Sequence, residues 1–172
     1  MIKKIFFYFL LFIVILSFYV VCELVYRPFY KTGFNTLVDK YEHHKRRPYL
    51  YEKYTDSSPD GKGYYFITNN IGWRDSLKNN KIQKESKDYR IVILGDSFIE
   101  ARGYNFEETI PGQLKRKLAK NNFKGEVLNG GTSSHSSLLS YNRLYKFFKA
   151  GYTTDLVILM PDYSDVQDEL IY

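Results

Sequence analysis

The chain has 172 residues, enough for one ordinary domain plus an extension, and 44% of them are hydrophobic, which excludes a disordered chain. Its formal charge of +6 is spread over many short groups of lysine and arginine, a pattern typical of a solvated surface rather than a nucleic-acid footprint. Cys22 is the only cysteine, which excludes an internal disulfide and a cysteine-rich metal site. We expect neither a metal ion nor a cofactor, and no nucleic-acid partner.

An uncharged apolar run near the N-terminus covers residues 5–22 and follows two lysines. At about 1.5 Å per residue, a helix of this length nearly spans a bilayer core of roughly 30 Å. A cleaved signal peptide is the alternative, but the residues before Cys22 offer no small-x-small cleavage site, and Val21 is large for a lipoprotein signal. We therefore predict an uncleaved transmembrane anchor over residues 1–26, with a cytoplasmic N-terminus and an extracytoplasmic remainder.

The next segment, residues 27–88, is irregular and is punctuated by proline and glycine. Only residues 63–68 have the composition of a strand, and residues 79–87 form a polar, lysine-rich connection. The pattern predicts an irregular extracytoplasmic linker or extension.

From residue 89 to residue 172 the pattern becomes regular and predicts a β-α-β-α-β order. Thr109 is suited to cap the first helix, in which Pro111 stands in the first turn. The second helix has one apolar stripe, which is typical of a side that faces a core. The predicted strands are residues 91–94, 126–129 and 156–160, the second helix covers residues 137–150, and its stripe is Leu138, Tyr141, Tyr145 and Phe148.

Short connections between these elements imply a parallel sheet with right-handed crossovers. Each predicted strand ends in a polar or glycine-rich turn: Asp96-Ser97, Gly130-Gly131 and Ser164-Asp165. In a parallel sheet these three turns meet at the carboxyl edge, where ligands bind in such folds. A serine at this edge can be a nucleophile if a base lies within hydrogen-bond reach.

The order of these turns resembles the SGNH (GDSL-like) hydrolase superfamily. The match is carried by Gly95-Asp96-Ser97-Phe98, by residues 68–75 (TNNIGWRD), and by residues 128–133 (LNGGTS). The resemblance implies a flavodoxin-like three-layer α/β/α fold with a parallel sheet, of which about three core strands lie in residues 89–172. It also implies that Ser97 is the nucleophile, and that the N–H groups of Ser97 and Gly131 form the oxyanion hole.

Two positions depart from the pattern of that superfamily. Ser164 stands where its third block has an oxyanion-binding asparagine, so we expect the shorter hydroxyl as a donor, with Asp96 and Asp165 in supporting roles. The catalytic Asp-x-x-His block is absent up to residue 172, and we expect its histidine in a later segment. Residues 128–133 resemble the second block of the superfamily, and residues 132–136 are called the second-block loop below. His135 lies in this loop, where it either contacts substrate or caps a helix.

These features predict a serine esterase or acyl hydrolase, anchored in the cell membrane, that acts on an acylated glycan or lipid. The alternative is a catalytically silent module that binds envelope glycan or a partner protein, and a third interpretation is a truncated gene product. The pattern leaves the oligomeric state open. One set of acidic residues suggests either hard-cation binding or a helix start: Asp162, Asp165, Asp168 and Glu169.

Overall fold

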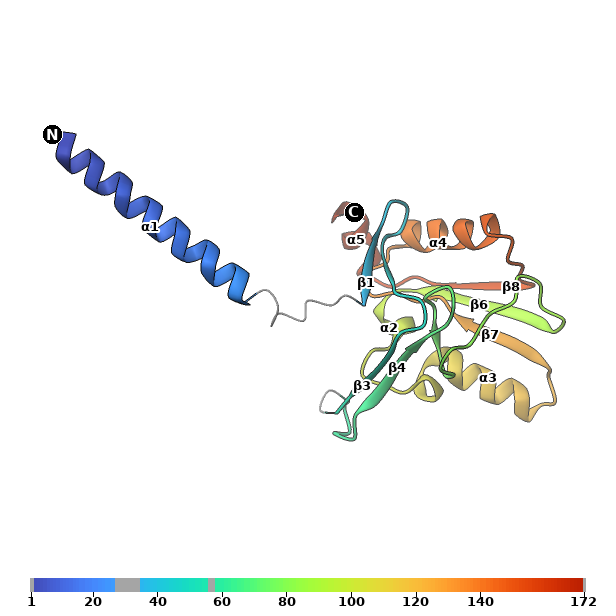
Figure 1. The fold of residues 1–172 in the computed structure, drawn as a ribbon. Coiled ribbons are helices and arrows are strands. Elements are labelled where there is room, and N and C mark those ends of the chain that lie inside the picture. The colour runs from blue at the N-terminus through green and yellow to red at the C-terminus, as the bar shows by residue number, and fades with distance from the viewer. Residues whose placement is uncertain (1, 27–34, 56–57, 172) are drawn as a thin grey trace. The chain divides into compact units, whose positions relative to one another are not determined.

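The structure, a computed structural model, describes residues 2–26, 35–55 and 58–171. The chain divides into two compact units, residues 1–34 and residues 35–172 (Figure 1). In the first unit, helix α1 (Ile2–Tyr26) contains a 22-residue stretch, Lys4–Val25, with a mean hydropathy of 2.8 and no buried part. This long apolar helix is consistent with a signal anchor or a signal sequence.

The second unit is a mixed α/β fold built on a six-stranded sheet and a separate two-stranded hairpin. The strand order in the sheet is β3-β4-β5-β7-β6-β8, and β6 pairs in parallel with both β7 and β8. These three strands confirm the predicted parallel core. Their bounds are β6 (Tyr89–Gly95), β7 (Gly125–Asn129) and β8 (Leu156–Met160).

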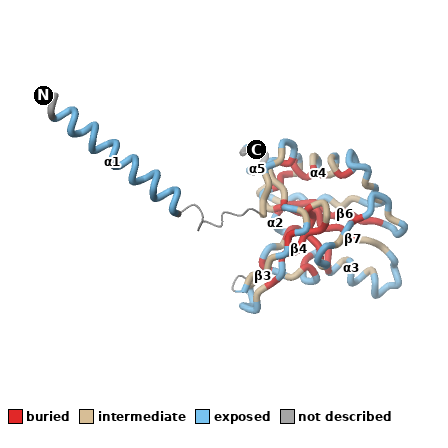
Figure 2. Tube along the Cα trace, in the orientation of Figure 1, coloured by how far each residue is buried: buried red, intermediate tan, exposed pale blue. Residues whose placement is uncertain are grey.

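Two helices cover opposite faces of β6, because its side chains alternate between the faces. Val92 and Leu94 pack with Phe147 of α4 (Ser137–Lys149), whereas Ile91 and Ile93 pack with the side of α3 (Ile110–Lys120). Figure 2 shows the buried residues gathered along the sheet and α2 (Ser97–Glu100), whereas α1 is exposed along its described length. The remaining helices are the short η1 (Phe106–Glu108) and α5 (Asp165–Ile171).

The segment predicted to be an irregular linker differs most from expectation. Strand β4 coincides with the one strand-like run, but four further strands also form there, and all five belong to the second unit. The strands are β1 (Thr36–Asp39), β2 (His43–Arg46), β3 (Tyr51–Tyr54), β4 (Tyr64–Thr68) and β5 (Arg74–Asp75). Among these strands, β1 pairs with β2, β3 with β4 and β4 with β5, all antiparallel, and β5 pairs antiparallel with the distant β7.

The second predicted helix forms, but it turns a different side to the core. The residues of the predicted stripe, Leu138, Tyr141, Tyr145 and Phe148, are 46–61% exposed. The buried side of α4 instead carries Leu139, Ser140, Arg143 and Phe147. An arginine is buried there because Glu42, in the turn of the β1–β2 hairpin, pairs with it at 2.8 Å. The prediction that the stripe faces the core was therefore wrong.

Candidate active site

Ser97 lies directly after the central strand, at the first position of α2. Asp96 caps this helix, because its Oδ1 accepts a hydrogen bond from the N–H of Phe98 at 2.9 Å. The side chain of Ser97 is exposed, and its Oγ donates to Oδ2 of Asp96 at 3.3 Å. The sequence therefore places an accessible hydroxyl beside a buried carboxyl group.

Acidic residues from the neighbouring parallel strand join Asp96. Asp162 and Asp165 follow β8, and carboxylate oxygens of these two residues and of Asp96 lie within 4.8 Å of one another. Burial raises the pKa of Asp96, and the negative charges of Asp162 and Asp165 raise it further, although the bond from Phe98 N–H opposes this. Asp96 therefore holds a proton more strongly than an ordinary aspartate.

Three clustered carboxylates are also the oxygen ligands that a hard cation prefers. Here, however, the oxygens have protein partners. Oδ1 of Asp162 accepts from Ser164, and Oδ2 of Asp165 accepts from Ser137 at 2.9 Å. The side chains of Asp168 and Glu169, the other members of the acidic set, lie outside the described residues.

The two further oxyanion donors expected from the sequence have internal partners. The N–H of Gly131 donates to Oδ1 of Asn129 at 3.0 Å, and the hydroxyl of Ser164 donates to Oδ1 of Asp162 at 2.6 Å. The N–H of Ser97 belongs to the first turn of α2, where backbone N–H groups have no acceptor within the helix. Of the three expected donors, the Ser97 N–H is thus the best placed to meet an incoming oxygen.

Glycine is required at position 131 because the loop after β7 packs closely on α2. A Cβ atom there would lie 2.5 Å from the backbone nitrogen of Glu100 and 2.7 Å from the carbonyl carbon of Ile99. Such approaches do not occur in proteins without a backbone shift. The second turn of the predicted site is therefore fitted against the helix that carries Ser97.

His135 is fully buried, so the prediction that it contacts substrate finds no support in the structure. Its Nε2 pairs with the carbonyl oxygen of His44 at 2.9 Å, and the two rings meet edge to face with centroids 4.9 Å apart. Burial, helped by the positive charge of Arg143, lowers the pKa of His135 to about 4. The ring is therefore neutral near neutral pH and fastens the β1–β2 hairpin to the second-block loop.

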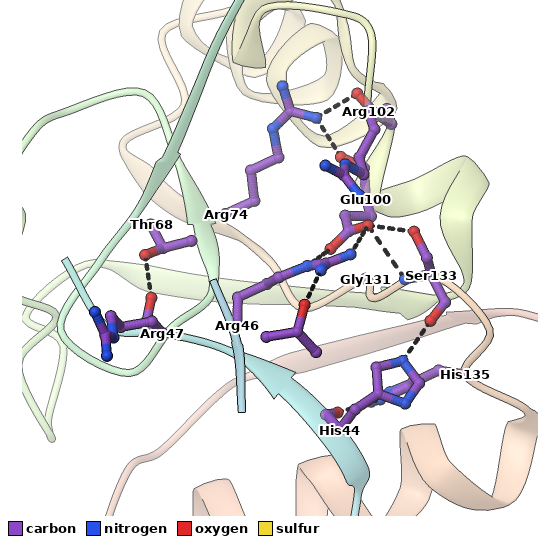
Figure 3. Close-up of polar contacts among 12 residues, drawn as sticks. His44, Arg46, Arg47, Thr68, Arg74, Glu100, Arg102, Gly131, Ser133 and His135 are labelled. Atoms are coloured by element: carbon purple, nitrogen blue, oxygen red, sulfur yellow. Dashed lines mark hydrogen bonds and ion pairs between the residues drawn. The ribbon is translucent and has the colours of Figure 1, made fainter. Parts of the chain in front are cut away.

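Sequence reasoning missed a buried polar cluster around Glu100, the last residue of α2 (Figure 3). Its carboxylate receives two hydrogen bonds from Arg46 of β2, at 2.5 and 2.8 Å, and one from the hydroxyl of Ser133. The cluster thus connects α2, the helix that begins at Ser97, to the hairpin and to the second-block loop. An acidic residue four positions after Asp96 was the available signal, but its partner lies 54 residues earlier in the chain.

Arg74 holds the same helix from the other side. Its guanidinium donates to the carbonyl oxygens of Glu100, Ala101 and Tyr104, and its plane lies over the ring of Phe66 with 4.9 Å between the guanidinium carbon and the ring centroid. These bonds explain why an arginine in the 68–75 stretch is almost completely buried. Through them, that stretch supports α2 and the chain that follows it.

The sequence was also compared with models of protein families and with curated proteins, and neither comparison finds a match. The resemblance to the SGNH superfamily therefore depends on the sequence motifs alone.

Proposed function

We propose that the chain is a membrane-anchored serine esterase or acyl transferase of the SGNH type, with a flavodoxin-like three-layer domain. The carrying observation is the exposed hydroxyl of Ser97 at the carboxyl end of the central parallel strand, hydrogen-bonded to a buried carboxyl group. In parallel α/β folds, this edge is where ligands bind. By family analogy, the substrate is an acylated glycan or lipid of the cell envelope.

In the proposed reaction, Ser97 Oγ attacks the ester carbonyl and the alcohol leaves, so that an acyl-serine forms. Water or a second alcohol then releases the acyl group. The N–H of Ser97 stabilises the negative oxygen of the tetrahedral intermediate, and the Gly131 N–H joins it once it exchanges its bond to Asn129. The resemblance assigns to a histidine of a later block the transfer of the Ser97 proton to the leaving alcohol. Among the described residues, Asp96 accepts a hydrogen bond from Ser97 Oγ.

A fluorophosphonate probe tests this proposal, because it labels only activated serines. We expect a full-length form that includes the later histidine block to be labelled in membranes, and its Ser97→Ala variant to be unlabelled. Ser86→Ala, in the connection before β6, is the matched control and keeps wild-type labelling. The proposal fails if the wild-type chain stays unlabelled or if Ser97→Ala is labelled equally.

The alternative is a silent module that binds envelope glycan or a partner protein. The observation that favours it is that the N–H of Gly131 and the hydroxyl of Ser164 already have internal acceptors. This function predicts equal binding of an acylated glycan by the wild-type chain and by Ser97→Ala, without ester cleavage by either. Weaker binding by Ser97→Ala together with cleavage by the wild type contradicts it.

We propose further that α1 is a single-pass anchor with its N-terminus in the cytoplasm. The support is the apolar length of Lys4–Val25, together with Lys3 and Lys4 at its N-terminal end. In a Cys22→Ser background, a membrane-impermeant maleimide should label Ser86→Cys on intact cells. Labelling only after the cells are lysed contradicts this orientation.

A further inference from the structure

A cavity of about 270 Å³ is bordered by α4, the β1–β2 hairpin and the turn before β5. Its apolar wall is a stack of rings: Trp73 lies on Phe147 with centroids 4.8 Å apart, and Phe147 lies on Tyr152 at 4.9 Å. The stack packs on the hydrophobic core, which makes the wall rigid. The volume falls below the roughly 300–1,000 Å³ of pockets for drug-sized ligands, so the cavity suits a small occupant.

Cationic side chains also line this cavity. Lys45 and Lys146 line it with side chains that are 32% and 28% exposed, and both ammonium groups pair with Asp39, at 2.8 and 2.6 Å. Lys146 also pairs with Glu42 at 2.8 Å. Burial alone would lower the pKa of Lys146, but its bonds to Asp39 and Glu42 raise it above the ordinary value. Lys146 therefore stays charged at neutral pH.

Arg143 supplies the observation that points to a ligand. It lines the cavity, its side chain is only 2% exposed, and its Nη1 pairs with Glu42 at 2.8 Å. Its buried Nε–H has no hydrogen-bond acceptor among the residues that the structure describes. A buried donor left without an acceptor costs free energy, which an oxygen atom of a bound molecule would recover.

The charges also fit a ligand of one sign. Lys45, Arg143 and Lys146 are three cations, and the carboxylates of Asp39 and Glu42 offset two of them. One positive charge remains for an occupant, next to an apolar wall. We propose that this cavity binds a small organic monoanion, with its anionic oxygens toward these three cations and its apolar ring or chain against the Trp73–Phe147 stack. This binding is independent of the chemistry proposed for Ser97.

Trp73 makes the test direct, because it is the only tryptophan of the chain and forms part of the wall. The full chain in lipid nanodiscs is titrated with cyclohexanecarboxylate, cyclohexylmethanol and cyclohexylmethylamine, which share a ring and differ in charge. We expect the carboxylate to change the Trp73 emission saturably, at a concentration at least about tenfold lower than the alcohol requires. The amine should produce no saturable change.

Variants then assign the binding to the cavity. Lys45→Gln and Lys146→Gln should each weaken carboxylate binding about tenfold, whereas Lys124→Gln, an exposed lysine before β7, leaves it unchanged. Far-UV circular dichroism checks folding, and if Lys146→Gln does not fold, Lys45→Gln decides. The proposal is overturned if the three compounds act alike, if none gives saturation, or if Lys45→Gln binds as tightly as the wild type.

Discussion

Replacing Arg46 by methionine should destabilise the second unit strongly, because it leaves the buried carboxylate of Glu100 without its ion-pair partner. That carboxylate is completely buried, and two of its hydrogen bonds come from the Arg46 guanidinium. Breaking a buried ion pair from one side costs about 3–5 kcal/mol. The two remaining bonds, from the hydroxyl and the backbone N–H of Ser133, still stabilise part of the charge of Glu100, so we expect a loss of about 3 kcal/mol in unfolding free energy.

The pH dependence of this loss distinguishes two causes: an unpaired charge on Glu100, and the loss of packing by the Arg46 side chain. Burial alone would raise the pKa of Glu100, but the hydrogen bonds and charge of Arg46 lower it below the ordinary value in the native protein. The pair thus adds stability above the unfolded pKa of about 4.3 and loses it as the pH falls through the lower native pKa. In Arg46→Met, the pKa of Glu100 lies higher in the native protein than in the unfolded chain. The loss of unfolding free energy caused by the substitution should therefore become smaller as the pH falls from about 7 to about 4.

Urea unfolding, followed by the emission of Trp73 in the full chain, measures both effects. Lys62→Met is the control, because its pair with Asp60 is highly exposed and should leave the unfolding free energy unchanged. The reasoning is refuted if Arg46→Met loses less than about 1 kcal/mol, or if its loss is the same at both pH values.

Three further predictions concern single residues. Thr109→Ala removes the cap that accepts the N–H of Gly112 at the start of α3, and should cost about 1 kcal/mol in urea unfolding; Thr109→Ser, which keeps the oxygen, should cost less. Gly131→Ala forces the second-block loop away from α2, and should abolish fluorophosphonate labelling of Ser97 while far-UV circular dichroism is retained; full labelling would contradict this. His135 has a native pKa of about 4. Stability should therefore fall by up to about 3 kcal/mol as the pH drops from about 6.5 to about 4, because the unfolded chain binds the proton more readily. His135→Gln should flatten this slope, and an unchanged slope would assign it to other groups.

The core of the sheet was predictable because its signals are local. Strand β6 contains the continuous aliphatic run of residues 91–94, which is typical of a buried parallel strand, and Thr109 with Pro111 indicates the start of α3. The β-α-β-α-β order predicted that the turns after the strands meet at the carboxyl edge of the sheet. The structure places Asp96, Asp162 and Asp165 together at that edge.

The hairpin and the buried face of α4 were not predictable, because long-range ion pairs determine them. Strand β2 has the sequence His-His-Lys-Arg, which shows no alternation of apolar and polar residues. The ion pair between Arg46 and Glu100 positions this strand. Arg143 is likewise buried in an ion pair with Glu42, so the hydrophobic periodicity of α4 predicted the wrong buried side. The pairing of His44 with His135 also joins residues about 90 positions apart, which explains why the loop looked accessible.

The junction between the antiparallel and parallel parts of the sheet has a consequence for slow motions. Strand β5 has two residues, and its ladder with β7 consists of one residue pair, Arg74 with Asn129. In native-state hydrogen exchange we expect β3 and β4 to open as a cooperative unit of lower free energy than β6 and β7. The guanidinium of Arg74 in β5 donates to the carbonyl oxygens of Glu100 and Ala101 at the end of α2. The side chain that supports the candidate active site therefore also influences the free energy at which β3, β4 and β5 separate from the rest of the sheet.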